Sequence, residues 1–207
     1  MSRTGPLKVA VFASGSGSNF QALAEAVQQG GIDATISLVV CDKPSAYVLE
    51  RAKAFHIETY EFRPKEYASR EAYEEKIVAK LQETGIDLIV MAGYMRLVTN
   101  VLVEPYYGRM INIHPALLPA FPGMDGIGQA IAYGAKIAGA TVHFVDGGTD
   151  TGPIIAQRAV EVLEGDTKET LGARIQKIEH ALLPEVVRLI AAGRVSLNGR
   201  HVTIAQG

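Results

Sequence analysis

Short apolar runs alternate with amphipathic stretches along most of the chain. The runs at residues 9–13 and 36–40 are rich in β-branched residues and have the length of buried strands, and helical periodicity occupies residues 20–27 between them. The same alternation of helix, strand, helix and strand continues over residues 46–55, 57–60, 69–83 and 88–92. Near-continuous apolar strands that alternate with helices predict a parallel sheet covered on both faces.

The pattern changes after about residue 105. A strand is predicted at 110–114, and an uncharged, proline-rich loop follows at 115–123 that is too long to serve only as a connection. Two more strands, a helix that contains Pro184 and a terminal hairpin around Asn198-Gly199 are expected over residues 138–144, 154–160, 166–189 and 194–204. We therefore predict one α/β domain over residues 1–207, with a Rossmann-like, mostly parallel sheet and halves of about 1–105 and 106–207.

Composition and charge narrow the class of partner. The 20 Lys and Arg residues nearly balance the 22 Asp and Glu residues, giving a formal net charge of -2 at pH 7. A chain this close to neutral has no general electrostatic attraction for nucleic acid or an anionic membrane. The single Cys41 cannot form an internal disulfide, and no Cys/His pattern has the spacing of a zinc site, as expected of a cytoplasmic protein that uses no metal. These features favour small-molecule ligands.

The turn after the first strand reads SGSGSN over residues 14–19 and leads into the first helix. Glycines allow backbone N–H groups to approach a ligand, and a helix N-terminus attracts phosphate. Gly15 and Gly17 match part of the dinucleotide fingerprint, but Phe20 stands where the third glycine belongs. Three interpretations stay open: a phosphate site, a nicotinamide site in which Asp42 binds the ribose, and a plain turn with a Ser or Asn helix cap.

Asn112 and His114 are candidate catalytic residues. They are two residues apart on the predicted strand, so their side chains point the same way near its carboxyl end, where open α/β sheets place their sites. An amide N–H beside a protonated imidazole suits a developing oxyanion, which suggests acyl transfer. The simpler alternative is a hydrogen-bonded core histidine next to a turn amide.

The loop at residues 146–153, DGGTDTGP, supplies two further candidates. Asp150 could orient His114 and stabilise its charged form, and Asp146 could also reach a neighbouring site. An ordinary polar turn is the alternative. A metal site made of His114, His143 and Asp150 is disfavoured because no ligand-spacing signature is present.

The SGSGSN turn, the INIHPALLP segment with its following FPG, and the DTGPI loop occur in that order along the chain. Together they resemble the glycinamide ribonucleotide formyltransferase family, folate-dependent enzymes of purine biosynthesis, over nearly the whole chain. The resemblance implies transfer of the formyl group of the co-substrate 10-formyltetrahydrofolate to the glycine amine of the ribonucleotide. It also implies that Asn112, His114 and Asp150 are catalytic.

The same resemblance assigns ligand contacts residue by residue. It implies that the ribonucleotide, including its phosphate, is held by Gly17, Ser18, Asn19 and Glu179. It implies folate contacts from Arg70, Met95, Arg96, Leu97, Val98, Asp146 and Asp150. The sequence departs from the family pattern at two places, so the resemblance leaves the roles of these residues open. Gln176, which is followed by Lys177, stands where some relatives have a lysine. Residues 124–127 replace a histidine-containing stretch of other relatives.

Several rival functions remain at this point. Formyltetrahydrofolate deformylase would use the same three residues with water as the acceptor, but normally carries an additional amino-terminal domain. Methionyl-tRNA formyltransferase normally has an extra C-terminal domain and an excess of basic residues that suits tRNA binding. Outside this class stand a nicotinamide-dependent dehydrogenase and a non-catalytic phosphate-binding module. We expect a monomer or a homodimer.

Overall fold

The computed structural model describes residues 5–206. The chain divides into two compact units, residues 1–111 and 112–207, and the boundary falls inside strand β5 (Met110–His114). The expectation of one domain with halves that meet near residue 105 stays a prediction.

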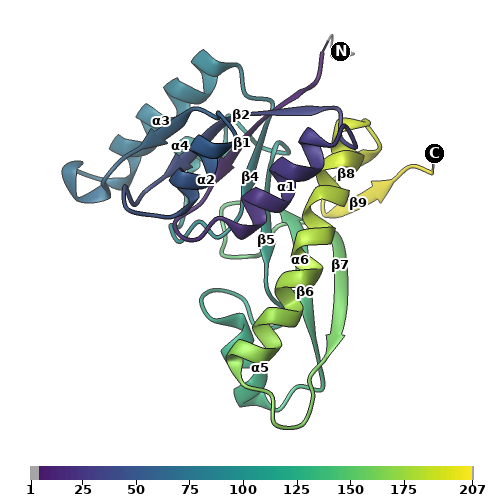
Figure 1. The fold of residues 1–207 in the computed structure, drawn as a ribbon. Coiled ribbons are helices and arrows are strands. Elements are labelled where there is room, and N and C mark those ends of the chain that lie inside the picture. The colour runs from purple at the N-terminus through teal and green to yellow at the C-terminus, as the bar shows by residue number, and fades with distance from the viewer. Residues whose placement is uncertain (1–4, 207) are drawn as a thin grey trace. The chain divides into compact units, whose positions relative to one another are not determined.

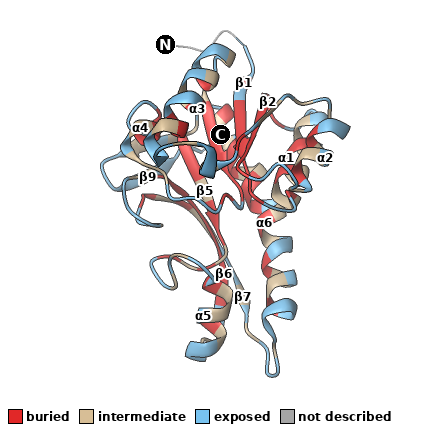
Figure 2. Ribbon diagram, turned by 90° about the vertical axis from the view of Figure 1, so that its left-hand side faces the viewer, coloured by how far each residue is buried: buried red, intermediate tan, exposed pale blue. Residues whose placement is uncertain are grey.

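The first unit is a parallel sheet with helices on both faces. Its strands pair in the order β3-β2-β1-β4, and every pairing among them is parallel. Figure 2 shows these buried strands between α1 and α2 on one side and α3 and α4 on the other. The elements are β1 (Leu7–Phe12), α1 (Ser18–Gln28), β2 (Ala34–Cys41), α2 (Val48–Ala54), β3 (Thr59–Glu61), the 3-10 helix η1 (Pro64–Glu66), α3 (Arg70–Thr84), β4 (Leu88–Met91) and α4 (Asn100–Val103).

The second unit continues from β5 and ends in a separate hairpin (Figure 1). Its β6 and β7 pair antiparallel, and α6 packs against both of them. The hairpin strands pair Asn198 with His201, so the turn residues are Gly199 and Arg200, one position later than expected. The elements of this unit are α5 (Gly126–Tyr133), β6 (Ile137–Phe144), β7 (Ile154–Glu161), α6 (Lys168–Ala191), β8 (Val195–Asn198) and β9 (His201–Ile204).

The predicted mostly parallel α/β sheet is confirmed, and the expected elements form with end shifts of a few residues. The reason is that β4, and β1 apart from the exposed Lys8, consist of buried apolar residues. The helix α6 begins after a capping box at Thr167 and includes Pro184 without ending there. Three short elements, η1, α4 and α5, were not predicted. Within residues 5–206, no helix combines the length and the apolar character needed to cross a membrane.

The proline-rich loop after β5 is fastened to β6 by one buried hydroxyl. Thr141 is fully buried, and its Oγ1 donates to the carbonyl oxygen of Ala116 at 2.7 Å. The same oxygen accepts the N–H of Leu118 at 3.1 Å and the amide N–H of Gln157 at 2.9 Å. A buried backbone group that loses its partner is costly, so this hydroxyl determines where the loop lies.

We expect Thr141→Val to lower the free energy of unfolding by about 1–3 kcal/mol, because the near-isosteric side chain leaves buried N–H and C=O groups without partners. Urea denaturation measures the change. Thr141→Ser is the matched control, since it keeps the hydroxyl and should lower the free energy of unfolding by less. Equal stabilities for the valine variant and the wild type would contradict the role of this hydroxyl.

Candidate active site

Strand β5 presents the two candidate side chains to one side. Asn112 is half-buried and His114 is buried, and they occupy alternate positions on the strand. Pro115 follows at once and favours an extended backbone at His114. The second unit therefore holds both residues on a rigid element, with the proline-rich loop directly after them.

The carboxylate of Asp150 lies between them. Its Oδ2 accepts the backbone N–H of Gly123 at 2.7 Å and lies 3.4 Å from Nδ1 of His114. Its Oδ1 accepts from Nδ2 of Asn112 at 3.3 Å and lies 3.5 Å from Nε2 of His143. The structure thus brings Asn112, His114 and Asp150 together, as the sequence suggested.

The surroundings of Asp150 keep it ionised at neutral pH. Burial alone would raise the pKa of this carboxyl group, but contacts with His143, the Gly123 N–H and His114 outweigh it and lower the pKa. Asp150 also has a φ of +54°, in the left-handed region that aspartate tolerates better than most residues. An ionised carboxylate here can stabilise a positive charge on His114.

His114 is also held from its other ring nitrogen. Nε2 lies 2.8 Å from the carbonyl oxygen of Phe121, and because a carbonyl can only accept, Nε2 carries a proton. Phe121 has a φ of +54°, which costs a bulky residue about 1–2 kcal/mol. A Cβ at position 126 would lie 3.2 Å from this Nε2, so Gly126 leaves room for the bond. Nδ1 is then the nitrogen that faces Asp150.

His143 has a positioning role that the sequence did not reveal. Its Nδ1 lies 2.7 Å from the Phe144 carbonyl oxygen and therefore donates to it, which fixes the ring. Its Nε2 lies 3.2 Å from Nδ2 of Asn112 and 3.5 Å from Oδ1 of Asp150, to which Nδ2 donates one N–H. The second N–H of the amide then stays available for a reacting oxygen.

Asp146 shapes the loop that carries Asp150. Its Oδ1 accepts the N–H of Gly148 at 3.0 Å and the hydroxyl of Thr151 at 2.6 Å. These bonds close residues 146–151 into a turn, which accords with the simpler alternative for this residue. The predicted contact of Asp146 with folate stays a prediction.

The glycine-rich turn in the first unit ends on Gly17, which caps α1 in the left-handed conformation with no side-chain cap. The alternative of a Ser or Asn side-chain cap is therefore wrong. A Cβ at position 17 would lie 2.5 Å from Cγ2 of Val48, so only glycine fits there. Ser18 and Asn19 begin the helix, whose first turn has no acidic residue. Such an end is suited to an anion.

Segment 93–99, which joins β4 to α4, carries four of the predicted folate contacts, Met95, Arg96, Leu97 and Val98. Nε of Arg96 donates to Oδ2 of Asp42 at 2.7 Å. Asp42 is buried and engaged in this way, which argues against a ribose ligand of a dehydrogenase. The fifth predicted contact, Arg70, is exposed at the first position of α3.

The remaining candidates lie on or beside α6. Glu179 is on its buried side, whereas Gln176 and Lys177 are exposed. Residues 124–127, which differ from the family pattern, lie at the start of a helix. Asp125 accepts the N–H of Gly128 and caps α5. Asp125 also pairs with Lys168 at 2.7 Å.

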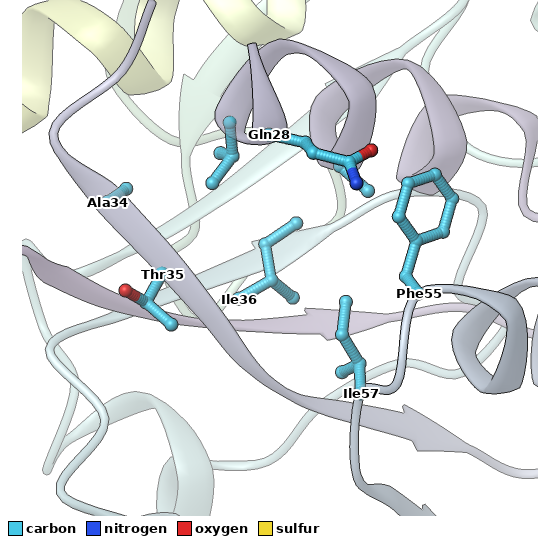
Figure 3. A pocket seen from close by; sticks show the side chains of 8 residues that line it. Gln28, Ala34, Thr35, Ile36, Phe55 and Ile57 are labelled. Atoms are coloured by element: carbon cyan, nitrogen blue, oxygen red, sulfur yellow. The ribbon is translucent and has the colours of Figure 1, made fainter. Parts of the chain in front are cut away.

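The hollow that the structure shows in the first unit contains none of these side chains. This hollow, of about 190 Å³, is lined mainly by apolar side chains of α1, β2 and residues 55–57 (Figure 3). It includes no predicted site residue. Across residues 5–206, no group of three or more His, Cys, Asp or Glu side chains is placed to hold a metal ion.

Comparisons with known proteins identify relatives of this chain. The chain is 51% identical over 193 residues to a phosphoribosylglycinamide formyltransferase of Bacillus subtilis (strain 168), covering 93% of this chain and 97% of that protein. The structure superposes on glycinamide ribonucleotide transformylase 1 from Symbiobacterium toebii with a TM-score of 0.96 and 44% identity, covering 99% and 96% of the two chains.

A further solved structure is more distant in sequence. It is a formyltetrahydrofolate deformylase from Pseudomonas syringae pv. tomato, with a TM-score of 0.90 and 25% identity, covering 98% of this chain and 67% of that one. The model of the formyl transferase family matches residues 7–187. Since that match spans most of the sequence, the chain belongs to the formyl transferase family.

Proposed function

We propose that the protein transfers the formyl group of 10-formyltetrahydrofolate to the glycine amine of glycinamide ribonucleotide, a step of purine biosynthesis. The observation that carries the proposal is the convergence of Asn112, His114 and the ionised Asp150. The relatives at 51% and 44% identity, whose names specify this ribonucleotide, support the choice of substrate.

The chemistry needs no group beyond these side chains and the two substrates. The amine nitrogen forms a bond to the formyl carbon, and the carbonyl electron pair moves to the oxygen. N–H groups of Asn112 and His114 stabilise this oxyanion, and Asp150 stabilises the charged imidazole. Collapse restores the carbonyl and breaks the bond to the folate nitrogen, which takes up the proton that the amine loses.

The contact at Phe121 assigns the two nitrogens of His114 different tasks. Nε2 donates to the backbone carbonyl at 2.8 Å, which holds the ring in place. Nδ1 lies 3.4 Å from Asp150, which is longer than a strong hydrogen bond, so this nitrogen is not committed to the carboxylate and can serve a substrate oxygen. We therefore assign proton movement to Nδ1.

We assign the ligand contacts to two sets of residues, one for each substrate. Gly17, Ser18 and Asn19 hold the ribonucleotide phosphate through the start of α1, and Glu179 contacts the same substrate. The folate co-substrate is held by Arg70, Met95, Arg96, Leu97, Val98 and Asp146. Both substrates are small molecules, and a cytoplasmic location and a monomeric or homodimeric state complete the proposal.

One rival deserves a direct test, because a deformylase would use the same cluster with water in place of the amine. We expect release of tetrahydrofolate from 10-formyltetrahydrofolate only when glycinamide ribonucleotide is added, because the amine is the acceptor. Absorbance of the folate product follows the reaction. Release at the same rate without the ribonucleotide would instead establish hydrolysis.

Asn112→Ala should lower kcat by about 10²–10³, because it removes an oxyanion donor that acts mainly in the transition state. The KM values for both substrates should change much less. Steady-state kinetics measures both constants, and circular dichroism checks that the variant is folded. A variant with near-normal kcat would remove Asn112 from the mechanism.

The lowered pKa of Asp150 predicts a specific acid sensitivity. Because the folded protein holds this pKa below the usual 3.8, the contacts of the carboxylate add stability above that pH and lose it as the pH falls through the folded value. The gap in unfolding free energy between wild type and Asp150→Asn should therefore shrink as the pH falls below 3.8. Urea titrations at several pH values measure it, and a gap that is constant with pH would refute the assignment.

A further inference from the structure

Segment 93–99 is anchored at both ends by polar side chains from elsewhere in the first unit. Near its start, the hydroxyl oxygen of Ser14 accepts the N–H of Met95 at 2.9 Å. At its end, the buried carboxylate of Glu74 on α3 accepts the N–H of Thr99 at 3.0 Å and its hydroxyl at 2.5 Å. These bonds fix the course of an exposed loop that would otherwise have few restraints.

Between these anchors the segment presents apolar side chains to solvent. Met95 is 61% exposed and Leu97 is 56% exposed, which is unusual for large apolar residues so close together. Within residues 5–206, the peptide groups of Leu97 and Val98 make no hydrogen bond. The segment therefore has the character of a binding surface, as the proposed folate contacts require.

Arg96 is the charged residue of this surface, and a third side chain holds it. Asp42 follows β2 and its side chain is fully buried, while the side chain of Arg96 is 42% exposed. Their contact uses Nε of the guanidinium, 2.7 Å from Oδ2. The two Nη groups form a separate edge of the planar group and are not part of this bond.

The two charges depend on each other. Among residues 5–206, Oδ1 of Asp42 accepts no hydrogen bond, so Arg96 supplies the balancing charge for this buried carboxylate. A buried carboxylate that is paired with a single cation holds that cation in one geometry, because releasing it would leave an unpaired charge. The usual freedom of an exposed arginine is thereby removed.

Arg70 adds a second positive charge to the same neighbourhood. Burial and the Glu74 carboxylate raise the pKa of Tyr73, while Arg70 and Arg96 both act in the opposite direction. Both guanidinium groups are therefore close enough to Tyr73 to influence it. Two cations in one neighbourhood suit a ligand that ends in carboxylates.

We propose that Asp42 is a positioning residue that fixes Arg96 so that its Nη groups bind the glutamate carboxylates of the folate co-substrate. This rests on the proposed function, which supplies the folate. Arg96 needs to be oriented before binding, because ordering a long side chain on a ligand costs affinity. Asp42 does that from the buried side, without contacting the ligand itself.

The test compares equilibrium binding of two probes by calorimetry: tetrahydrofolate, and tetrahydropteroate amide, which lacks the glutamate and carries no carboxylate. Asp42→Ala should raise the Kd for tetrahydrofolate about ten-fold and leave the Kd for the amide unchanged. Asp42→Asn keeps an oxygen that can accept from Nε and should lose less affinity. In an Arg96→Met background, Asp42→Ala should have no further effect on the Kd for tetrahydrofolate.

Glu61→Gln is the matched control, because Glu61 is an exposed carboxylate at the end of the neighbouring strand β3 and should affect neither Kd. Equal losses for both probes, or an undiminished effect of Asp42→Ala in the Arg96→Met background, would overturn the positioning role. Asp42→Leu, which has a similar size but no acceptor, covers the case in which the alanine variant fails to fold, since a folded leucine variant that binds both probes like wild type also overturns it.

Formyl transfer by the wild type is assayed in parallel. Transfer together with unchanged probe binding in the Asp42 variants would reject the positioning role and leave the proposed function standing. Lack of transfer together with the expected probe binding would reject the function and support the role. A wild type that does not bind tetrahydrofolate would overturn both.

Discussion

The carboxylate of Asp150 is the interaction on which the catalytic cluster depends. Each of its two oxygens approaches a pair of groups, one from the proline-rich loop and β5, the other from β5 and β6. A neutral side chain could accept one of these bonds but could not balance a positive charge on His114. The loop that carries Asp150 is in turn closed by Asp146. One ionised group therefore holds β5, β6, the proline-rich loop and its own loop in the arrangement that the chemistry requires.

In the first unit, too, buried polar side chains determine where a functional loop lies. Its central strands β1 and β4 are largely apolar and buried, which stabilises the sheet but does not specify the path of the loops at the strand ends. Those paths are set by buried polar groups: Ser14, Asp42 and Glu74 each reach from one element to segment 93–99. Apolar burial supplies the scaffold, and a few costly buried polar groups specify the binding surface.

Much of this could be predicted from the sequence, because the strands are apolar runs and Asn112 and His114 lie two apart on one of them. The helix α5 was missed because its GIGQAIAY sequence has little helical signal and its cap, Asp125, adopts a left-handed conformation. Asp42 was open to a wrong interpretation as a ribose ligand, since its partner Arg96 is distant along the chain. The role of His143 depends on a tautomer, which is determined by the Phe144 carbonyl and by no local motif.

The bond from His114 to the carbonyl of Phe121 has a consequence for how such enzymes are studied. The acceptor is a main-chain atom, so no amino-acid replacement deletes it, and the identity of the side chain at position 121 carries only part of the information. Exhaustive mutational scanning would therefore undercount the groups that tune this imidazole. Only a change to the backbone itself, such as sulfur in place of the carbonyl oxygen of Phe121, would weaken the acceptor and expose its contribution.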